Sequence, residues 1–392
     1  MVFFSPSERV SKLPVNFFKG LDQKLAASAQ TGQPFLDLSK GNPDLPTPRH
    51  IVDAMKEAIE KSENQAYPPF LGKENVRQAI ADFYKREYGV VLDPTKEIAI
   101  FHGAHIGITG IPQALLNPGD YMLITDPCYP IYYSAAVLAQ ANTYAMPLEE
   151  STHFLPDYRC IPDHVLAKVR LLLLNYPNNP TGALATEAFY QSTIDLAKSR
   201  QLPVVNDFAY ASLGFDGRKP LSILQTDQAK SVAVEVYTMS KTYDMAGWRF
   251  GFAVGNASII QALNHFQTHA YSTVFGAVQD AAACALQSSQ QCAAEIAHTY
   301  ERRRDVLIHG LRKIGWEVTA PPAGTFFAWL KVPKGYTSET FANLLFDEAH
   351  IVVAPGIGFG KRGDSFIRIS LVNAEERLTE AVSRIKALHV FE

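Results

Sequence analysis

One lysine stands between two apolar segments, where a basic side chain has no obvious structural use. Lys241 lies in "SKTYDMAGWRFGFAVG" (240–255), after the run "SVAVEVYTM", and Arg249 follows eight residues later. A lysine amine forms Schiff bases with carbonyl compounds, and pyridoxal phosphate is the common biological aldehyde that is held in this way. The segment therefore suggests a pyridoxal-phosphate site built around Lys241.

Such a cofactor needs an acid for its ring nitrogen and hydrogen bonds for its 3′ oxygen. Asp207, in "VVNDFAY", follows an apolar run, where an ionised carboxylate is costly unless a cation such as a protonated pyridinium pairs with it. From spacing alone, a helix N-cap explains Asp207 equally well. Tyr210 and Asn179, the latter in "NYPNNPTG", are candidates for the 3′ oxygen, although a core tyrosine and a plain turn are simpler explanations of each alone.

The cofactor's phosphate needs an anion site, and "HGAHIG" (102–107) lies where a helix should begin. The first N–H groups of a helix and its dipole bind anions, although a glycine before a helix is by itself a weak signal. The hydroxyls of Thr238 and Ser240 and the guanidinium of Arg249 would complete a phosphate cup.

Two further residues are candidates for contacts with the ring and the substrate. Tyr129, in "DPCYP", can stack on the cofactor ring, although core packing explains an isolated tyrosine equally well. Arg368, in "FIRIS", lies on a predicted strand and either faces solvent or offers its guanidinium fork to the α-carboxylate of an amino acid.

The elements that must position these residues are predicted as alternating strands and helices. Between about residues 95 and 255, helical stretches such as "TEAFYQSTIDLAKSRQ" separate apolar runs that suit a mostly parallel sheet buried on both faces. This alternation favours a doubly wound α/β domain, in which ligands bind beyond the carboxyl ends of the strands. The predicted strands lie in "EIAIFHG", "YMLITDP", "VRLLLLNYP", "LPVVNDFAY", "SVAVEVYTMSK" and "WRFGFAVG".

From about Gln287 the pattern changes to a long charged helix, "CAAEIAHTYERRRDVLIHGLRKIG", followed by short β-rich runs. This pattern predicts a second, smaller α+β domain, which the Pro-rich N-terminal segment joins. We therefore expect an N-terminal arm with part of the small domain over residues 1–49, a large cofactor-binding domain over 50–286 and a small C-terminal domain over 287–392.

Composition narrows the class of protein. The net charge of −3, with basic and acidic residues mixed along the chain, gives no basic stripe for nucleic acid. The four scattered cysteines form no disulfide framework and no CxxC, so we expect no metal. With no apolar run of membrane-spanning length and no signal-peptide pattern, we expect a cytoplasmic protein that does not contact a membrane.

Four motifs occur together in one order: "NNPTG" (178–182), "NDFAY" (206–210), "SKTYDMAGWRFG" (240–251) and "FIRIS" (366–370). In this order and rough spacing they resemble the class I/II aminotransferases, which are pyridoxal-phosphate enzymes of fold type I. The resemblance covers essentially the whole chain. It implies a large domain with a mixed, mostly parallel seven-stranded sheet covered by helices, a smaller α+β domain, and a homodimer with shared active sites.

The resemblance also implies roles for individual residues. Lys241 would bind the cofactor and, once the substrate displaces it, move a proton between the substrate and the cofactor. Asp207 would pair with the ring nitrogen, and Tyr129 would stack on the ring. The 3′ oxygen would be contacted by Asn179 and Tyr210, and the substrate by Gly41, Asn179 and Arg368. The phosphate would be bound by Ala104, His105 (through its backbone), Thr238, Ser240 and Arg249, and by Tyr67 from a second subunit.

The predicted function is the transfer of an amino group from an amino acid to a 2-oxo acid by a ping-pong mechanism through Lys241. Segments such as "KGNPDLPTP" are similar to bacterial aminotransferases acting on methionine, aromatic or similar neutral amino acids. Alternatives are a cystathionine-type C–S β-lyase with the same cofactor and an aspartate aminotransferase. A non-enzymatic regulator on the same fold is disfavoured, because we expect no added DNA-binding module.

The side chain of the substrate is predicted to be uncharged. A dicarboxylate substrate needs a second cation for its distal carboxylate. The nearest candidate by sequence is Lys40, just before "GNPD", for which a solvated loop lysine is the simpler interpretation. Four N-terminal phenylalanines could instead close an apolar lid, although packing of the arm explains at least two of them. These are Phe3, Phe4, Phe17 and Phe18.

Overall fold

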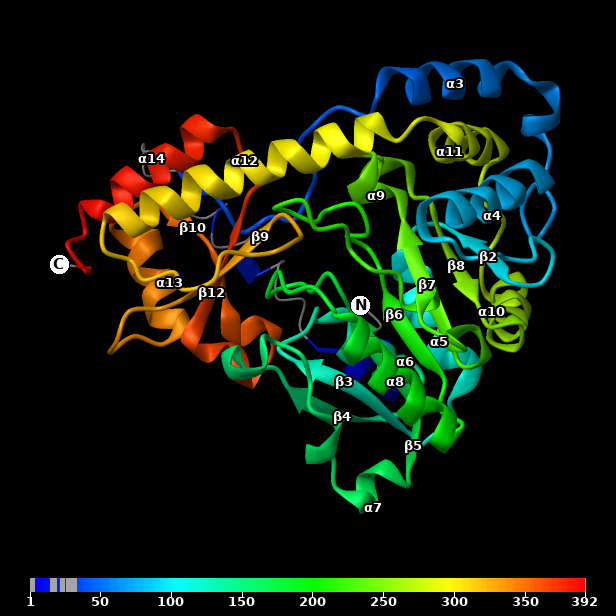
Figure 1. Cartoon of the computed structure of the whole chain (residues 1–392), viewed down its shortest axis with the longest axis horizontal. Coiled ribbons are helices and arrows are strands. Elements are labelled where there is room, and N and C mark those ends of the chain that lie inside the picture. Colours follow the sequence, from blue (N-terminus) through cyan, green and yellow to red (C-terminus); the bar gives the residue numbers. More distant parts are fainter. Residues whose placement is uncertain (1–3, 15–19, 22–24, 26–33, 392) are drawn as a thin grey trace.

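The structure, a computed structural model, describes residues 4–14, 20–21, 25 and 34–391. It has two connected parts (Figure 1): a large twisted sheet with helices on both faces, and a smaller group of short strands and helices toward the C-terminus. The long helix α12 (Gln291–Lys313) extends across both parts.

The large sheet has seven strands in the described part of the chain, as the resemblance implies. Strand β8 runs antiparallel to both of its neighbours, and the other pairs are parallel. In spatial order the strands are β2 (Ile98–Phe101), β8 (Gly251–Gly255), β7 (Ala233–Thr238), β6 (Val204–Asp207), β5 (Val169–Asn175), β3 (Tyr121–Asp126) and β4 (Asn142–Pro147).

Six of these strands lie in the runs predicted from sequence, and β4 does not. Its sequence, "NTYAMP", contains no long apolar run, because β4 is an edge strand whose residues are mostly half-buried. The apolar signal that identifies a strand buried on both faces is therefore absent from an edge strand.

Both faces of the sheet are covered because successive side chains of a strand point to opposite sides. In β5, Leu171 and Leu173 pack into one hydrophobic cluster, and Leu172 and Leu174 pack into the other. The first cluster is closed by α5 (Ala104–Leu115), α6 (Ile131–Leu138) and α10 (Ala257–Ala270). The second is closed by α3 (Arg49–Glu60), α4 (Glu74–Tyr88), α8 (Glu187–Arg200) and α11 (Gly276–Gln287).

The smaller part holds a three-stranded antiparallel sheet and a two-stranded parallel one. The N-terminal strand β1 pairs with β10, so Leu36 and Leu38 share a hydrophobic cluster with the C-terminal elements. The elements of this part are β1 (Leu36–Asp37), β9 (Phe327–Lys331), β10 (Ile351–Val352), β11 (Ala354–Pro355), β12 (Phe366–Ser370), α13 (Ser338–Asp347) and α14 (Glu375–Lys386). Three further short α-helices are α1 (Glu8–Ser11), α7 (Asp163–Leu166) and α9 (Met239–Thr242).

Candidate active site

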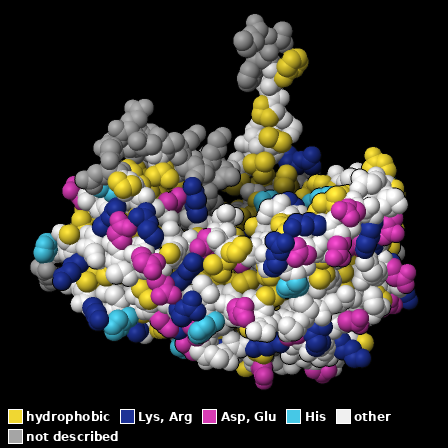
Figure 2. Space-filling view, turned by 90° about the horizontal axis from the view of Figure 1, so that it is seen from above, with side chains coloured by type: hydrophobic (Ala, Val, Ile, Leu, Met, Phe, Trp, Pro, Cys, Tyr) yellow, Lys and Arg dark blue, Asp and Glu magenta, His cyan; other side chains and the backbone are white. Residues whose placement is uncertain are grey.

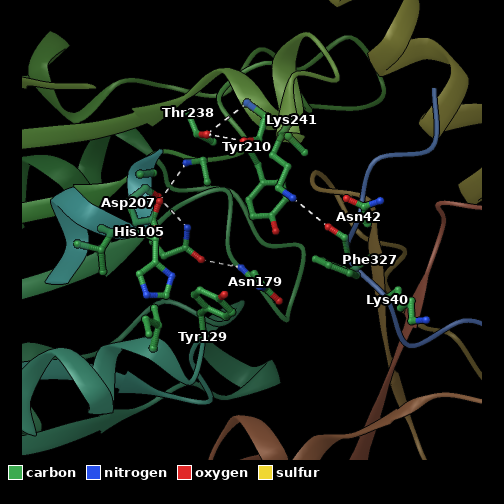
Figure 3. A pocket seen from close by; sticks show the side chains of 18 of the residues that line it. Lys40, Asn42, His105, Tyr129, Asn179, Asp207, Tyr210, Thr238, Lys241 and Phe327 are labelled. Carbon is green, nitrogen blue, oxygen red and sulfur yellow. Dashed lines mark hydrogen bonds between the residues drawn. The ribbon is translucent and has the colours of Figure 1, made fainter. Parts of the chain in front are cut away.

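A cavity of about 540 Å³ lies at the carboxyl ends of the central strands, facing β9 and β12 of the smaller part. This volume is typical of a site for a small molecule. Figure 3 shows that Asp207, Tyr210 and Lys241 lie on one side of it and Lys40, Asn42 and Phe327 on the other. Of the predicted site residues, the cavity is lined by Gly41, Ala104, His105, Tyr129, Asn179, Asp207, Tyr210, Thr238, Ser240, Lys241, Arg249 and Arg368.

Asp207 is the last residue of β6 and is only 6% exposed. A turn and not a helix follows it, so it is not an N-cap. One carboxylate oxygen accepts a hydrogen bond from the Tyr132 hydroxyl (2.9 Å) and the other from the Ala209 N–H (3.2 Å). Burial raises the pKa of Asp207 to about 6 despite these bonds. A cationic ligand beside Asp207 would therefore stabilise its ionised form.

Two residues that support Asp207 were not predicted as site residues. The Asn175 side chain, at the end of β5, donates to the Asp207 carbonyl (2.7 Å) and accepts from the Asn179 N–H (2.8 Å), which joins the turn to the acid. Tyr132 follows Tyr129 by three residues, and their rings meet edge to face at 6.0 Å. Its apolar segment "IYYSAAVL" resembles ordinary core, and only the i, i+3 spacing from Tyr129 could have indicated it.

Lys241 lies in α9, a single helical turn that directly follows β7. Its Nζ donates to the Gly41 carbonyl (2.9 Å) and lies 5.1 Å above the Phe326 ring. Burial, with the charges of Arg368 and Arg249, lowers the pKa of Lys241 to about 8. A buried amine with a lowered pKa is the form in which lysine acts as a nucleophile and exchanges protons near neutral pH.

Groups that suit an anion lie together at the start of α5. Gly103, with φ of +84°, leads into the helix, and a Cβ there would lie 2.6 Å from an Arg249 nitrogen. A glycine is therefore required for the arginine to approach the helix N-terminus. The hydroxyl of Thr238 donates to that of Ser240 (3.0 Å) beside it. Free helical N–H groups, two hydroxyls and a guanidinium together suit a phosphate.

Arg368 is 2% exposed, so its guanidinium does not face solvent. It donates to the side-chain oxygen of Asn179 (3.0 Å) and to the Ser39 carbonyl (2.8 Å), and it lies 3.7 Å from the centre of the Phe327 ring. Burial lowers the pKa of Arg368 to about 10, which still leaves it charged at neutral pH. A charged fork at the cavity wall suits a carboxylate.

Some predicted residues are not brought to this cavity. Tyr67 is 93% exposed and does not line it. Phe4 is 85% exposed, while Phe3, Phe17 and Phe18 lie outside the described residues. Lys40, interpreted as a solvated loop residue, does line the cavity, where it is half-exposed and pairs with Asp37 at 3.1 Å.

Over residues 4–14, 20–21, 25 and 34–391, no three His, Cys, Asp or Glu side chains are placed to hold a metal ion. In the same part of the chain, no helix combines the length and the apolarity needed to cross a membrane. The face in Figure 2 carries basic and acidic side chains interspersed.

The cavity residues fit pyridoxal phosphate on the chemistry of the donor set. A buried carboxylate suits the ring nitrogen, a lysine with a lowered pKa suits the aldehyde, and the start of α5 suits the phosphate. The fold and this cavity define a pyridoxal-phosphate enzyme of fold type I. The family model described as "Aminotransferase class I and II" matches residues 33–385, so the chain belongs to the class I and II aminotransferases.

Individual relatives are similar over nearly the whole chain. It is 50% identical over 388 residues to the L-glutamine–4-(methylsulfanyl)-2-oxobutanoate aminotransferase of Bacillus subtilis (strain 168), with 99% of this chain and 97% of the relative covered. It is 44% identical over 385 residues to the LL-diaminopimelate aminotransferase of Aquifex aeolicus (strain VF5), with 98% and 99% covered. The structure of substrate-bound BacF from Bacillus subtilis matches with a TM-score of 0.94 at 43% identity, with 99% of this chain and 98% of that chain covered.

Proposed function

We propose that this aminotransferase acts on neutral amino acids, with methionine, glutamine and aromatic residues as donors and the matching 2-oxo acids as acceptors. The observation that carries the proposal is the charge of the cavity wall. Arg368 is assigned to the substrate α-carboxylate and Arg249 to the phosphate, while Lys40 is half-exposed and paired with Asp37. A second carboxylate on the substrate side chain would therefore lack a buried cation of its own. The similarity to an enzyme named for glutamine and 4-(methylsulfanyl)-2-oxobutanoate supports the same class of substrates.

When bound, pyridoxal phosphate supplies a carbon that accepts the amino group and a ring that withdraws electrons from the substrate Cα. We assign the binding of the substrate and the movement of its proton to residues of the chain. Arg368, oriented by Asn179, holds the α-carboxylate, and Asp207 holds the proton on the ring nitrogen. The amine of Lys241 removes the proton from the substrate Cα and delivers it to the cofactor carbon that accepted the amino group. Its pKa of about 8 lets it both accept and donate a proton near neutral pH.

In the roles proposed for the remaining residues, Tyr129 stacks on the ring, and Asn179 and Tyr210 donate to its 3′ oxygen. The N–H groups of Ala104 and His105 bind the phosphate. Tyr210 is 6% exposed, and burial raises the pKa of its hydroxyl, so it stays a hydrogen-bond donor at any working pH.

A donor screen tests the substrate class. We expect methionine, glutamine and aromatic amino acids to exceed aspartate in kcat/KM, with glutamate accepted at most as a second substrate. Preferences among the neutral donors should be broad, because an apolar pocket discriminates by only about 10- to 200-fold per methylene. The measurement is kcat/KM for each donor with a fixed 2-oxo acid. A higher value for aspartate than for every neutral donor contradicts the proposal, and pyruvate and ammonia released from cystathionine without any oxo acid would show a C–S lyase instead.

We also propose that the enzyme works as a homodimer in which Tyr67 completes the phosphate site of the partner subunit. Tyr67 and Phe70 are 93% and 68% exposed, and Phe70 shares a cleft with Tyr271, which is 36% exposed. Exposed aromatic side chains so close together are typical of an interface.

Sedimentation velocity should therefore show a dimer at assay concentrations, and Phe70→Asp should shift it toward monomer, because a carboxylate would be buried in the interface. Tyr67→Phe should leave the dimer intact and weaken cofactor binding, by about 10-fold for one lost hydrogen bond to a charged group. Val91→Asp, which changes another exposed apolar residue (67%), is the matched control and should stay dimeric. A fully active wild-type monomer rules out the proposal.

A further inference from the structure

Residues 41–47, which we name the strap, cross the cavity side of Lys241 and are held from three directions. The Gly41 carbonyl accepts the hydrogen bond from Lys241 Nζ (2.9 Å). Six residues further on, the Thr47 hydroxyl donates to the Asp244 carbonyl (2.7 Å), in the loop that follows the lysine. Both ends of the strap therefore contact the segment that carries Lys241.

The middle of the strap is held by an ion pair. The Asp44 carboxylate receives two hydrogen bonds from the Arg303 guanidinium of α12, both 2.8 Å long, and a weaker one from the Tyr300 hydroxyl (3.3 Å). The Arg303 side chain is 7% exposed, and it also donates to the Leu371 carbonyl just beyond β12 (3.2 Å). Two parallel N–H···O bonds fix orientation as well as distance.

Close packing on the other side leaves the strap little freedom. A Cβ on Gly41 would lie 2.8 Å from the Phe327 ring, so the backbone there passes directly against that side chain. Just before the strap, the Ser39 carbonyl accepts from Arg368. The same stretch of backbone thus contacts both the amine proposed to move the proton and the guanidinium proposed to hold the substrate.

We propose that Asp44 is a positioning residue: its ion pair with Arg303 sets the strap so that the Gly41 carbonyl holds the free amine of Lys241 where it can take a proton from the substrate. The inference rests on the role proposed for Lys241. Without the ion pair the middle of the strap is no longer fixed, and the Gly41 carbonyl shifts. The Lys241 amine then samples positions from which it cannot reach the substrate proton. A displacement of about 1 Å in a reacting group costs on the order of 100-fold in rate.

The chain offers a matched control one residue further along α12. Arg304 forms the same kind of two-bond ion pair with Asp216, at 2.8 and 2.7 Å, and its side chain is similarly buried, but Asp216 lies outside the strap. Asp44→Asn and Asp216→Asn each remove the carboxylate charge that pairs with one arginine of α12. Only the first should lower kcat, by about 10- to 100-fold, with KM changed less than about 3-fold, because the loss falls on proton transfer and not on binding.

Proton transfer is read directly as the exchange of the substrate α-hydrogen with deuterated solvent. Exchange should fall in Asp44→Asn as much as kcat does. It should also fall, by a smaller factor, in Thr47→Val, which removes one tether and leaves the ion pair in place. If Asp44→Asn does not fold, Thr47→Val decides. The inference is overturned if the folded strap variants exchange as fast as Asp216→Asn.

A second readout needs no cofactor. Acetic anhydride labels only the neutral amine, so mass spectrometry of the Lys241 peptide across pH gives the midpoint of its titration in the cofactor-free protein. The charges that face this amine are Arg249, Arg368, Asp207 and Asp244. The Asp44 charge in turn raises the pKa of Asp244, so the titration is compared in Thr47→Val, which changes no charge. Since the Gly41 carbonyl stabilises the ammonium form, its displacement should lower the midpoint in Thr47→Val but not in Asp216→Asn. Equal midpoints in wild type and Thr47→Val would overturn the inference. If instead the proposed role of Lys241 were wrong, Lys241→Ala would keep α-hydrogen exchange.

Discussion

Lys241→Ala should bring turnover to the background of the assay, a loss of at least about 10³-fold in kcat, and should remove the visible absorption band of the cofactor-bound protein. Two functions are lost together, because the same amine binds the cofactor and moves the substrate proton. General acid–base catalysis alone supplies about 10²- to 10⁴-fold. The measurements are the steady-state rate with an amino donor and a 2-oxo acid, and the absorption spectrum after loading with pyridoxal phosphate.

Lys230→Ala is the control for loss of a lysine. Lys230 forms an ion pair with Glu97 (2.7 Å), and neither residue lines the cavity, so its removal should leave kcat and the spectrum unchanged. An added primary amine such as methylamine should restore part of the activity of Lys241→Ala, because a small base can enter the space left by the side chain. Normal turnover in Lys241→Ala would refute the assignment of the whole site.

Asp207→Asn should lower kcat and kcat/KM together, on the order of 10³-fold, while the protein still binds the cofactor. Asparagine can still accept from the Tyr132 hydroxyl, so the geometry survives while the charge that keeps the ring nitrogen protonated is lost. A parallel fall in both parameters marks an interaction that matters most in the transition state. An unchanged kcat would remove Asp207 from the mechanism.

The same substitution should have the opposite effect on stability. Because burial raises the pKa of Asp207 from 3.8 to about 6, the folded cofactor-free protein holds this proton more tightly than the unfolded chain does. The stabilisation that comes from holding this proton is fully present below about pH 4. It is lost as the pH rises through 6, because the folded protein then buries a charged carboxylate. At neutral pH Asp207→Asn should therefore raise the free energy of unfolding of the cofactor-free protein, by about 3 kcal/mol at most.

Glu235→Gln provides the matched control for both effects. Glu235 is a second buried carboxylate on the neighbouring strand β7, and burial raises its pKa to about 7, but it faces Tyr84, Ser222 and Asn206 instead of the cavity. Thermal unfolding of the two cofactor-free variants compares the stability effect, and kcat compares the function. Glu235→Gln should leave kcat unchanged, and an equal fall in both variants would show that Asp207 acts only through stability.

The sequence by itself was sufficient for the parts of this protein that depend on local pattern. Strands buried on both faces are continuous apolar runs, so six of the seven strands of the large sheet were predicted, and the polar residues at their carboxyl ends marked the site. Asp207, Lys241 and the start of α5 at Ala104 lie where this reasoning placed them. Edge strand β4 was missed because its half-exposed residues carry no such pattern.

Only the tertiary structure decided which distant side chains meet. Tyr132 reaches Asp207 across 75 positions in the chain, Lys241 reaches Gly41 across 200, and Arg303 reaches Asp44 across 259. Sequence pattern predicts whether a residue is buried but not which partner it meets, because the partner depends on how helices and sheets pack together. The two interpretations left open for Arg368 were separated in the same way, since packing against Phe327 and Phe359 turned its guanidinium away from solvent and into the cavity.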